Sequence, residues 1–201
     1  AAVGEPPTRL HPVAWFGRVV APLDREWGRP LVVGTFGAVV LPLVAAGVAG
    51  GAVVVAGSWT QFAAALVAGV ALFLSTSLRR LLGAARSVVD DSDADVEAAR
   101  EGLLALAGRN ASTLTPGQLR SAAVESAAEN LADGLVAPLG AFVVAAALAA
   151  ATGLATLPVA VAGAAWVKGV NTMDSMLGYR SKRVGTPAAR LDDAVMWLPA
   201  R

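Results

Sequence analysis

The sequence predicts an all-α fold, a polytopic helical membrane protein with two transmembrane hairpins and a cytoplasmic helical excursion between them. Hydrophobic residues make up 56% of the chain and charged residues 15%, against roughly 25% charged in soluble domains. No Asp, Glu, Lys or Arg occurs in residues 31–78 or 134–167. All sixteen Lys and Arg fall in residues 1–30, 79–133 and 168–201. These gaps and clusters of charge predict the arrangement of the chain.

Each uncharged stretch is long enough for a pair of helices. A membrane-spanning helix needs about 20 apolar residues. Residues 31–78 therefore predict a first transmembrane hairpin with its turn at "GSWTQ", 57–61. The second hairpin is expected at 134–179, with its turn at "ATGLATLP", 151–158. It holds two short spans, or one span and a re-entrant piece. The alternative is an unusually apolar soluble protein, but buried helices seldom run this far without a charge.

If both apolar stretches are hairpins, the three charged segments share one side of the membrane. The positive-inside rule makes that side the cytoplasm. We therefore expect one multi-pass domain over residues 1–201 in the plasma membrane, with a lipid bilayer as its partner. Residues 79–133 form a cytoplasmic helical segment and residues 180–201 a cytoplasmic loop. Both ends of the chain look abrupt, so we expect a piece of a longer protein.

The cytoplasmic segment carries two helix signals. The run "DDSDADVEAAREGLLALAG" predicts an acidic first turn and an amphipathic helix that ends at Gly108. Downstream, "TPGQ" predicts a capping box with Thr115 as N-cap and Gln118 at the third helical position. A second helix should therefore begin near residue 116 and run towards the membrane.

Composition excludes several kinds of site. The chain has no cysteine, which excludes disulfides and thiolate metal sites, and its single histidine cannot form a histidine-based zinc site. A net charge of +1 gives no argument for a nucleic-acid partner. The P-loop, GxGxxG and GxSxG motifs do not occur. Any metal should be a hard cation with oxygen ligands, and Mg²⁺ is the first expectation.

Three carboxylates stand at helical spacing before the second apolar stretch. Glu125, Glu129 and Asp133 are four residues apart, so they stack on one helix face, where like charges repel. Their neighbours are Ala and Val, and partly buried carboxylates must be paired, protonated or bound to a cation. A divalent ion would turn the repulsion into a ligand set. The alternative is an ordinary solvated acidic face.

The stretch "KGVNTMDSMLGYRSKR", 168–183, continues an apolar span with a polar stripe. Asn171, Asp174, Ser175 and Gly178 share one helix face, opposite Val170, Met173 and Leu177. At membrane depth such a stripe faces the bundle interior or a water-filled cavity, which indicates a functional site. The alternative is an interhelical hydrogen-bond seam.

Two weaker motifs lie near the ends. In "ARLDDAVMWLPAR", Asp192 and Asp193 follow Arg190, a combination that suits metal-bound phosphate but also fits a surface salt-bridge cluster. In "RLHPVAWFGR", His11 is the one side chain whose unperturbed titration lies near neutrality, although a structural role at a helix start fits equally.

Four stretches together resemble the CobD/CbiB family: "GEPPTRLHPVAWFGR", "AAVESAAENLADGLVAPL", "VKGVNTMDSMLGYRSKR" and "ARLDDAVMWLPAR". The resemblance spans residues 4–201. It implies an integral membrane adenosylcobinamide-phosphate synthase of cobalamin biosynthesis. That enzyme joins the last free carboxylate of adenosylcobyric acid, a corrinoid, to the amine of aminopropanol phosphate or aminopropanol. ATP is the expected co-substrate and Mg²⁺ the expected cofactor; the oligomeric state stays open.

Together, the motifs and the resemblance place the site on acids and cations of the charged segments. Catalytic roles are expected for Glu125, Glu129 and Asp174, which leaves open which acid is the base. Metal ligation is expected from Glu129, Asp133, Asp174, Asp192 and Asp193. Substrate or phosphate binding is expected from His11, Asn130, Lys168, Asn171, Ser175, Tyr179, Arg180, Arg183 and Arg190. We expect these acids to converge on one polar cavity.

Two features limit the resemblance. The chain has "GRNAS" where the family commonly has "GRDTS", so an acidic role at Asn110 is excluded. The family also normally begins with an apolar segment and continues for roughly a hundred further residues.

The alternative functions are a membrane transporter, with the polar stripe lining a pathway, and a membrane phospho-alcohol transferase. "DGLVAP" partly resembles the "DG..AR" signature of such transferases, but Pro replaces the Arg.

Overall fold

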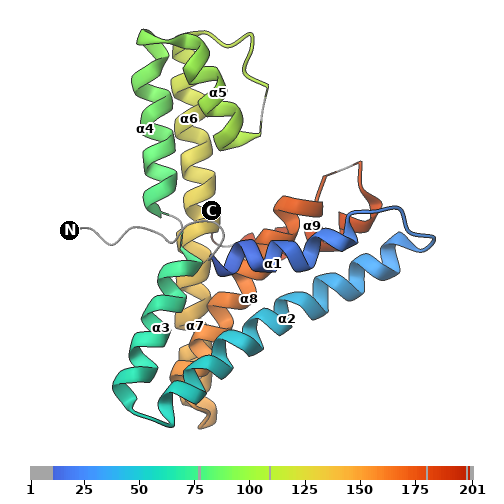
Figure 1. Cartoon of the computed structure of the whole chain (residues 1–201), viewed down its shortest axis with the longest axis vertical. Helices are drawn as coiled ribbons and strands as arrows, with labels where there is room; N and C mark the ends of the chain where they lie inside the picture. The colour runs from blue at the N-terminus through green and yellow to red at the C-terminus, as the bar shows by residue number, and fades with distance from the viewer. Residues whose placement is uncertain (1–10, 77, 109, 180, 198, 200–201) are drawn as a thin grey trace. The chain divides into compact units, whose positions relative to one another are not determined.

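The computed structural model is all-helical over the residues that it describes, which are 11–76, 78–108, 110–179, 181–197 and 199 (Figure 1). The α-helices are α1 (Pro12–Val20), α2 (Pro30–Gly57), α3 (Gln61–Ser75), α4 (Leu78–Ala94), α5 (Val96–Ala107), α6 (Pro116–Leu131), α7 (Ala137–Thr152), α8 (Thr156–Leu177) and α9 (Thr186–Met196). Short 3₁₀ turns lie at Ala21–Leu23 (η2) and Arg183–Gly185 (η4), and a π turn lies at Ala132–Val136 (η3).

The chain divides into two units, which are described separately. Residues 1–76 and 136–201 form the first, here called the apolar unit, and residues 77–135 form the second, here called the charged unit. Residues 79–133 lie within the charged unit, and their cytoplasmic location stays a prediction.

In the apolar unit, α2 and α8 approach closely where glycine removes a side chain. A Cβ atom at Gly50 of α2 would lie 2.9 Å from the carbonyl oxygen of Pro158, at the start of α8. Further along the pair, a Cβ atom at Gly169 of α8 would lie 3.1 Å from Cα of Pro42. Small residues that bring two backbones together are the usual packing device of membrane helices.

The same device joins α7 to α8. A Cβ atom at Gly163 would lie 2.7 Å from Cβ of Ala145. A left-handed Gly153 ends α7 before the turn into α8. The predicted turns are present: residues 58–60 separate α2 from α3, and residues 153–155 separate α7 from α8. That each pair crosses a membrane as a hairpin stays a prediction.

The charged unit is a conventional three-helix core. Side chains from α4, α5, α6 and the loop before α6 meet in one buried cluster of Val88, Ala99, Leu103, Ala111, Leu119 and Ala123. The predicted capping box at Thr115 and Gln118 is present, and Gly108 ends α5 with a left-handed φ of 63°. The predicted helix that ends at Gly108 is present as α5, with Glu97 in its first turn, but the prediction was wrong for the first part of the acidic run, residues 90–94. That part forms the last turn of α4, which ends at Ala94, and Asp95 then caps α5 by accepting a hydrogen bond from Ala98 N at 3.1 Å.

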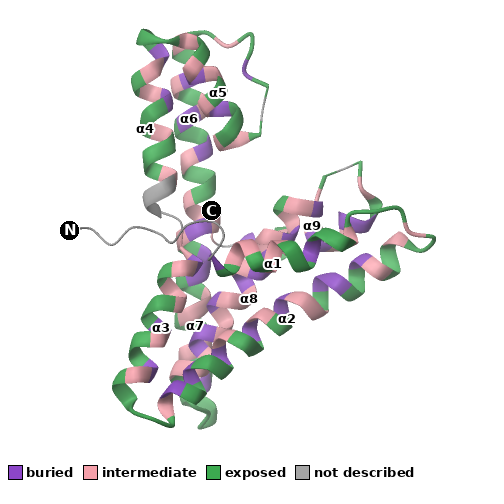
Figure 2. Ribbon diagram, in the orientation of Figure 1, coloured by how far each residue is buried: buried purple, intermediate pink, exposed green. Residues whose placement is uncertain are grey.

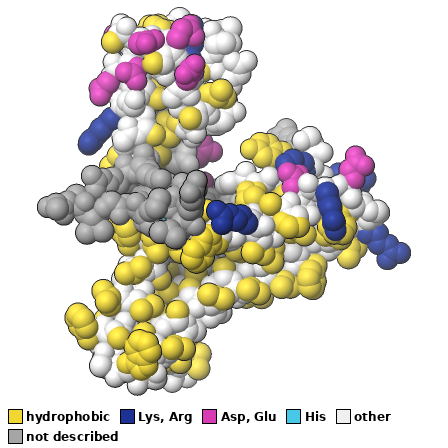
Figure 3. All heavy atoms as spheres, viewed as in Figure 1, with side chains coloured by type: hydrophobic (Ala, Val, Ile, Leu, Met, Phe, Trp, Pro, Cys, Tyr) yellow, Lys and Arg dark blue, Asp and Glu magenta, His cyan; other side chains and the backbone are white. Residues whose placement is uncertain are grey.

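The surfaces of the two units differ in kind. Two helical stretches are long and apolar enough to cross a membrane, Pro30–Gly57 and Pro116–Thr152. Only 28% and 17% of their most apolar windows are buried, whereas the core helix of a soluble protein is mostly buried. Figure 2 shows exposed residues along α2 and α3, and Figure 3 shows hydrophobic side chains over these helices and acidic ones over the charged unit. The apolar exposure suggests a membrane protein.

Candidate functional site

The acids of α6 lie on its exposed side. Glu125 and Glu129 are exposed, while Ala123 and Ser126 of the same helix are buried. Asn130 is also exposed and donates a hydrogen bond from Nδ2 to the carbonyl oxygen of Ser126 at 2.8 Å. The partial burial that the Ala-rich surroundings suggested for these two glutamates is therefore absent. Their role as catalytic or metal-binding acids stays a prediction.

Asp133 is set apart from the two glutamates by the local helix geometry. It is half-buried and lies in the π turn Ala132–Val136, between α6 and α7. A π turn is wider than an α turn, so it displaces the following side chains from the α-helical stack, and such turns occur frequently at functional sites. The sequence pattern missed this turn because four-residue spacing assumes an unbroken α-helix.

The C-terminal half of α8 has the two faces that the sequence predicts. Val170, Met173 and Leu177 are each 1% exposed and pack in the apolar unit. Asn171 and Asp174 are half-buried, and Ser175 is exposed, donating from Oγ to the carbonyl oxygen of Asn171 at 2.9 Å. In this unit the apolar face of α8 fills the core, so the polar stripe does not face the interior, and the alternative that it faces a water-filled cavity stays a prediction.

The chain reverses after α8 and brings α9 back alongside it. Gly185 makes this possible, since a Cβ atom there would collide with the carbonyl oxygen of Leu177. The reversal places Asp193 of α9 within electrostatic range of Asp174 on α8. The Asp192 side chain has a buried Oδ1 atom on the same helix. Of the predicted metal ligands, Asp174 and Asp193 are therefore near enough to interact electrostatically.

An acidic pair of this kind suits Mg²⁺. Like charges facing each other repel, and a cation between them removes the repulsion. Mg²⁺ is commonly held by one or two carboxylates together with substrate phosphates. Among the residues that the structure describes, no group of three or more His, Asp or Glu gathers as a metal ligand set. Asp174 and Asp193 have the donor chemistry for a phosphate-assisted Mg²⁺ site, and Mg²⁺ binding by this pair or by the larger ligand set stays a prediction.

The remaining predicted binding residues occupy varied positions. His11 is 8% exposed and caps α1, with Nδ1 accepting from Val13 N at 3.3 Å. Lys168 is half-buried on α8. Tyr179, Arg183 and Arg190 are exposed. Arg180 lies outside the described residues.

A cavity that sequence reasoning missed lies at one end of the apolar unit. It is open to solvent, has a volume of about 570 Å³, and is lined by residues 24–28 and Pro30, before and at the start of α2, and by residues 181–184, after α8. Asp24 and Lys182 join the two segments through an ion pair at 2.7 Å. The available signal was the charged run "DREWGR", 24–29. It was overlooked because its partner segment is about 150 residues away in the chain.

Tight backbone contacts hold the second segment in place. A Cβ atom at Gly34, in the second turn of α2, would collide with the carbonyl oxygen of Val184. Trp27 donates from Nε1 to the carbonyl oxygen of Leu23 at 3.1 Å, which fixes the first segment. The cavity is therefore a product of the fold rather than of one flexible loop.

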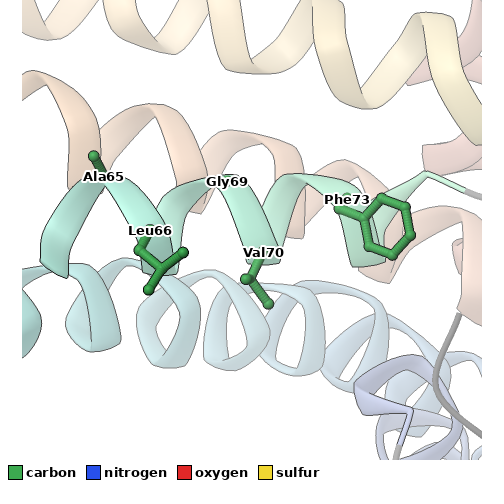
Figure 4. Close-up of a pocket in the computed structure, with 5 residues that line it drawn as sticks. All are labelled: Ala65, Leu66, Gly69, Val70 and Phe73. Carbon is green, nitrogen blue, oxygen red and sulfur yellow. The ribbon is translucent and has the colours of Figure 1, made fainter. Parts of the chain in front are cut away.

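A second hollow is apolar and lies along α3 alone (Figure 4). It is lined by Ala65, Leu66, Gly69, Val70 and Phe73. None of these side chains can move a proton, hold a charge or bind a metal. This hollow is not a candidate active site.

Comparison with known proteins gives one family. The family model described as CobD/Cbib protein matches residues 1–201. A probable cobalamin biosynthesis protein CobD of Archaeoglobus fulgidus is 36% identical over 204 residues, covering 100% of this chain and 63% of the relative. The corresponding protein of Methanothrix thermoacetophila is 35% identical over 211 residues, covering 99% of this chain and 64% of the relative.

A bacterial relative agrees. The cobalamin biosynthesis protein CobD of Klebsiella pneumoniae is 34% identical over 212 residues, with 99% of this chain and 61% of the relative covered. The chain thus spans less than two thirds of the length of these relatives. No solved structure matches the chain.

Proposed function

The chain belongs to the CobD/CbiB family, and from this premise we propose that it carries most of an adenosylcobinamide-phosphate synthase of cobalamin biosynthesis. The protein would join the free carboxylate of adenosylcobyric acid to the amine of aminopropanol phosphate, or of aminopropanol, at the expense of ATP. The observation that carries the proposal is the family match over all 201 residues. The names of the relatives support the pathway, and the reaction itself is our proposal.

The chemistry of this step explains why a site would need both acids and cations. An amide forms only after the carboxylate is activated, and ATP can do so by transferring its γ-phosphoryl group to a carboxylate oxygen, with ADP leaving. The amine then attacks the carbonyl carbon, phosphate leaves, and a base takes the proton of the amine. Cationic side chains are needed because negative charge is redistributed over phosphoryl oxygens during the transfer.

We assign these roles to the predicted residues. Glu125, Glu129 and Asp174 are the proposed catalytic acids, one of which accepts the amine proton. Asp174 and Asp193 are the proposed core of a Mg²⁺ site, to which Glu129, Asp133 and Asp192 are further proposed ligands. When bound, Mg²⁺ would neutralise phosphate charge. Lys168, Arg183 and Arg190 are proposed phosphate partners, as is Arg180 outside the described residues.

The remaining predicted residues have proposed binding roles. His11, Asn130, Asn171, Ser175 and Tyr179 are proposed to contact substrate. His11 also caps α1, so its proposed binding role is combined with a structural one. We further propose a plasma-membrane location in which the charged segments are cytoplasmic, with the exposed apolar helices in contact with lipid.

An amidation assay tests the proposal and separates it from its rivals. The full-length protein, including the region beyond this chain, is incubated with adenosylcobyric acid, aminopropanol phosphate, ATP and Mg²⁺. The expected product is the amide, with one ADP formed per bond. Transport without amide formation would favour a transporter, and transfer of a phospho-alcohol from a nucleotide carrier would favour a transferase. Either result would overturn the synthase.

Two isosteric variants sharpen the same assay. Asp174→Asn and Glu129→Gln keep the side-chain shape and remove one charge each. Loss of a preorganised electrostatic contact costs about 10²- to 10³-fold in rate. The rate of amide formation should therefore fall by this factor in both variants. Glu101→Gln, which changes an exposed acid of α5, is the matched control and should stay active. Excess Mg²⁺ should partly rescue a ligand variant but not the loss of the base, and full activity of both variants would refute the assignment.

A further inference from the structure

The cavity lined by residues 24–28, Pro30 and residues 181–184 carries charges of both signs. Its lining includes the acids Asp24 and Glu26 and the cations Arg25, Lys182 and Arg183. A volume of about 570 Å³ lies within the range of small-ligand sites, about 300–1,000 Å³. A ligand whose charges are all of one sign would be repelled by the lining residues that carry the same sign. The lining is complementary to a small molecule that has an anionic and a cationic end.

One of the charge pairs is structural. Lys182 and Asp24 hold the two segments together at 2.7 Å, and the Lys182 ammonium also lies 3.5 Å from the Met176 carbonyl oxygen at the end of α8. This pair joins the two segments that line the cavity. The groups that remain to recognise a ligand are Arg25, Arg183 and Glu26.

Arg25 is positioned for phosphate. Its guanidinium stacks on the Trp27 ring, with its carbon 4.0 Å from the ring centroid. Stacking occupies the face of the guanidinium but leaves the N–H groups in its plane, where they can fork onto two phosphate oxygens. Trp27 is in turn tied to the Leu23 carbonyl oxygen, so the guanidinium has a supported orientation. Arg183 lines the opposite segment and supplies a second cation.

We propose that this cavity binds the phosphorylated amino alcohol, with its phosphate on Arg25 and Arg183 and its ammonium on Glu26. This inference rests on the proposed function, for which it names the subsite of the amine substrate. The same zwitterionic chemistry occurs in the phosphoethanolamine headgroup of lipids, and the apolar helix α2 begins at the edge of the cavity, at Pro30. We assign the cavity to the free, soluble molecule.

Direct binding to the whole chain in detergent tests the assignment. Trp27 is a reporter within the cavity if the other tryptophans, at 15, 59, 166 and 197, are changed to Phe. Equilibrium dialysis on the unchanged chain provides an independent measurement should that variant fold poorly. The probes are aminopropanol phosphate, inorganic phosphate and aminopropanol. The zwitterion should bind at least about tenfold more tightly than either single-charge probe, since a charged hydrogen bond contributes about 1.5–3 kcal/mol and each 1.4 kcal/mol is tenfold.

Three variants and one control separate the two ends of the ligand. Arg25→Gln and Arg183→Gln should each lower the affinity for aminopropanol phosphate by about tenfold or more. Glu26→Gln should weaken the binding of aminopropanol phosphate. The same variant should leave the affinity for inorganic phosphate unchanged or slightly higher. Arg18→Gln, an exposed arginine of α1 outside the cavity, should change nothing. Equal affinity for inorganic phosphate and the zwitterion, or no effect of the two arginine variants, would overturn the proposal.

A lipid arm distinguishes the two sources of the ligand chemistry. The chain is placed in nanodiscs of phosphatidylcholine with or without phosphatidylethanolamine. A Trp27 response to phosphatidylethanolamine without any binding of free aminopropanol phosphate would overturn the assignment to the soluble molecule. The same variants separate this proposal from the proposed function. If the protein forms the amide and Arg25→Gln leaves the KM for aminopropanol phosphate unchanged, the proposed subsite is wrong and the synthase proposal stands. If the protein binds aminopropanol phosphate in this cavity but forms no amide, the synthase proposal is wrong and the subsite stands.

Discussion

The apolar unit and the charged unit of this chain solve the problem of helix packing in opposite ways. In the charged unit, apolar side chains such as Leu103 and Leu119 are fully buried, and ion pairs such as Arg120 with Asp93 lie at the surface. In the apolar unit, glycines let helix backbones approach closely, while large side chains such as Phe36 and Phe62 are 69% and 78% exposed. The two units belong to one chain, so each serves as a control for the other.

The difference shows which solvent each unit is built for. Water drives large apolar side chains inward, which is the pattern of the charged unit. In lipid that driving force between helices is absent, and close backbone packing through small residues replaces it. The apolar unit has this second pattern on α2, α7 and α8, which supports its proposed place in a bilayer.

The largest expected effect is the sidedness of the two units. The chain has no cysteine, so single cysteines at Ser58, between α2 and α3, and at Ser121, on α6, give clean labels; both positions are exposed. In intact cells an impermeant maleimide should label Ser58→Cys and leave Ser121→Cys unlabelled until the membrane is opened. Labelling of both from the same side would break the comparison.

Next in size is the cost of a charge on an exposed residue. Val44, near the middle of α2, is 55% exposed. In water such a position would tolerate lysine with a change within about 0.5 kcal/mol, but at the centre of a membrane helix lysine costs about 2.5–3.5 kcal/mol. Val44→Lys should therefore strongly reduce membrane insertion, measured by glycosylation mapping of the inserted fraction. The control is Leu104→Lys, at 53% exposure on α5, and equal tolerance at both positions would contradict a lipid-facing α2.

Much of this could be predicted from the sequence because charge and capping act locally. The uncharged stretches, the capping box at Thr115 and the two faces of α8 are properties of neighbouring residues. The cavity at Asp24 and Lys182 was missed because it depends on contacts between distant segments, the ion pair itself and the approach of Gly34 to Val184. The π turn at Asp133 was missed for a related reason: regular spacing carries no signal for an inserted residue.

A smaller effect is expected from adjacent glycines of α2. Gly50→Ala would place Cβ 2.9 Å from the Pro158 carbonyl oxygen, and α8 must shift to accommodate it. Overpacking of this kind costs about 1–3 kcal/mol. Gly51→Ala meets no described atom within 4 Å and should be neutral or stabilising, by up to about 1 kcal/mol of helix propensity. Thermal unfolding in detergent measures the change in stability for both variants. Equal changes at the two positions would contradict the close α2–α8 contact at Gly50.

The smallest expected effect concerns the surface of the charged unit. Arg120 pairs with Asp93 at 2.7 Å between α6 and α4, and the two side chains are 41% and 75% exposed. Water screens such a pair, so its coupling should be only about 0.2–1 kcal/mol.

A double-mutant cycle of Arg120→Met and Asp93→Asn, followed by amide hydrogen exchange in α4 and α6, measures this coupling. Arg120 also donates to the buried Ser92 Oγ at 3.0 Å, so the single Arg120 variant should cost more than the coupling itself. Rising salt should lower the coupling, because exposed charges are screened. A salt-insensitive coupling well above this range would mean that the charged unit is shielded from water at this face, and the contrast between the two units would then need to be redrawn.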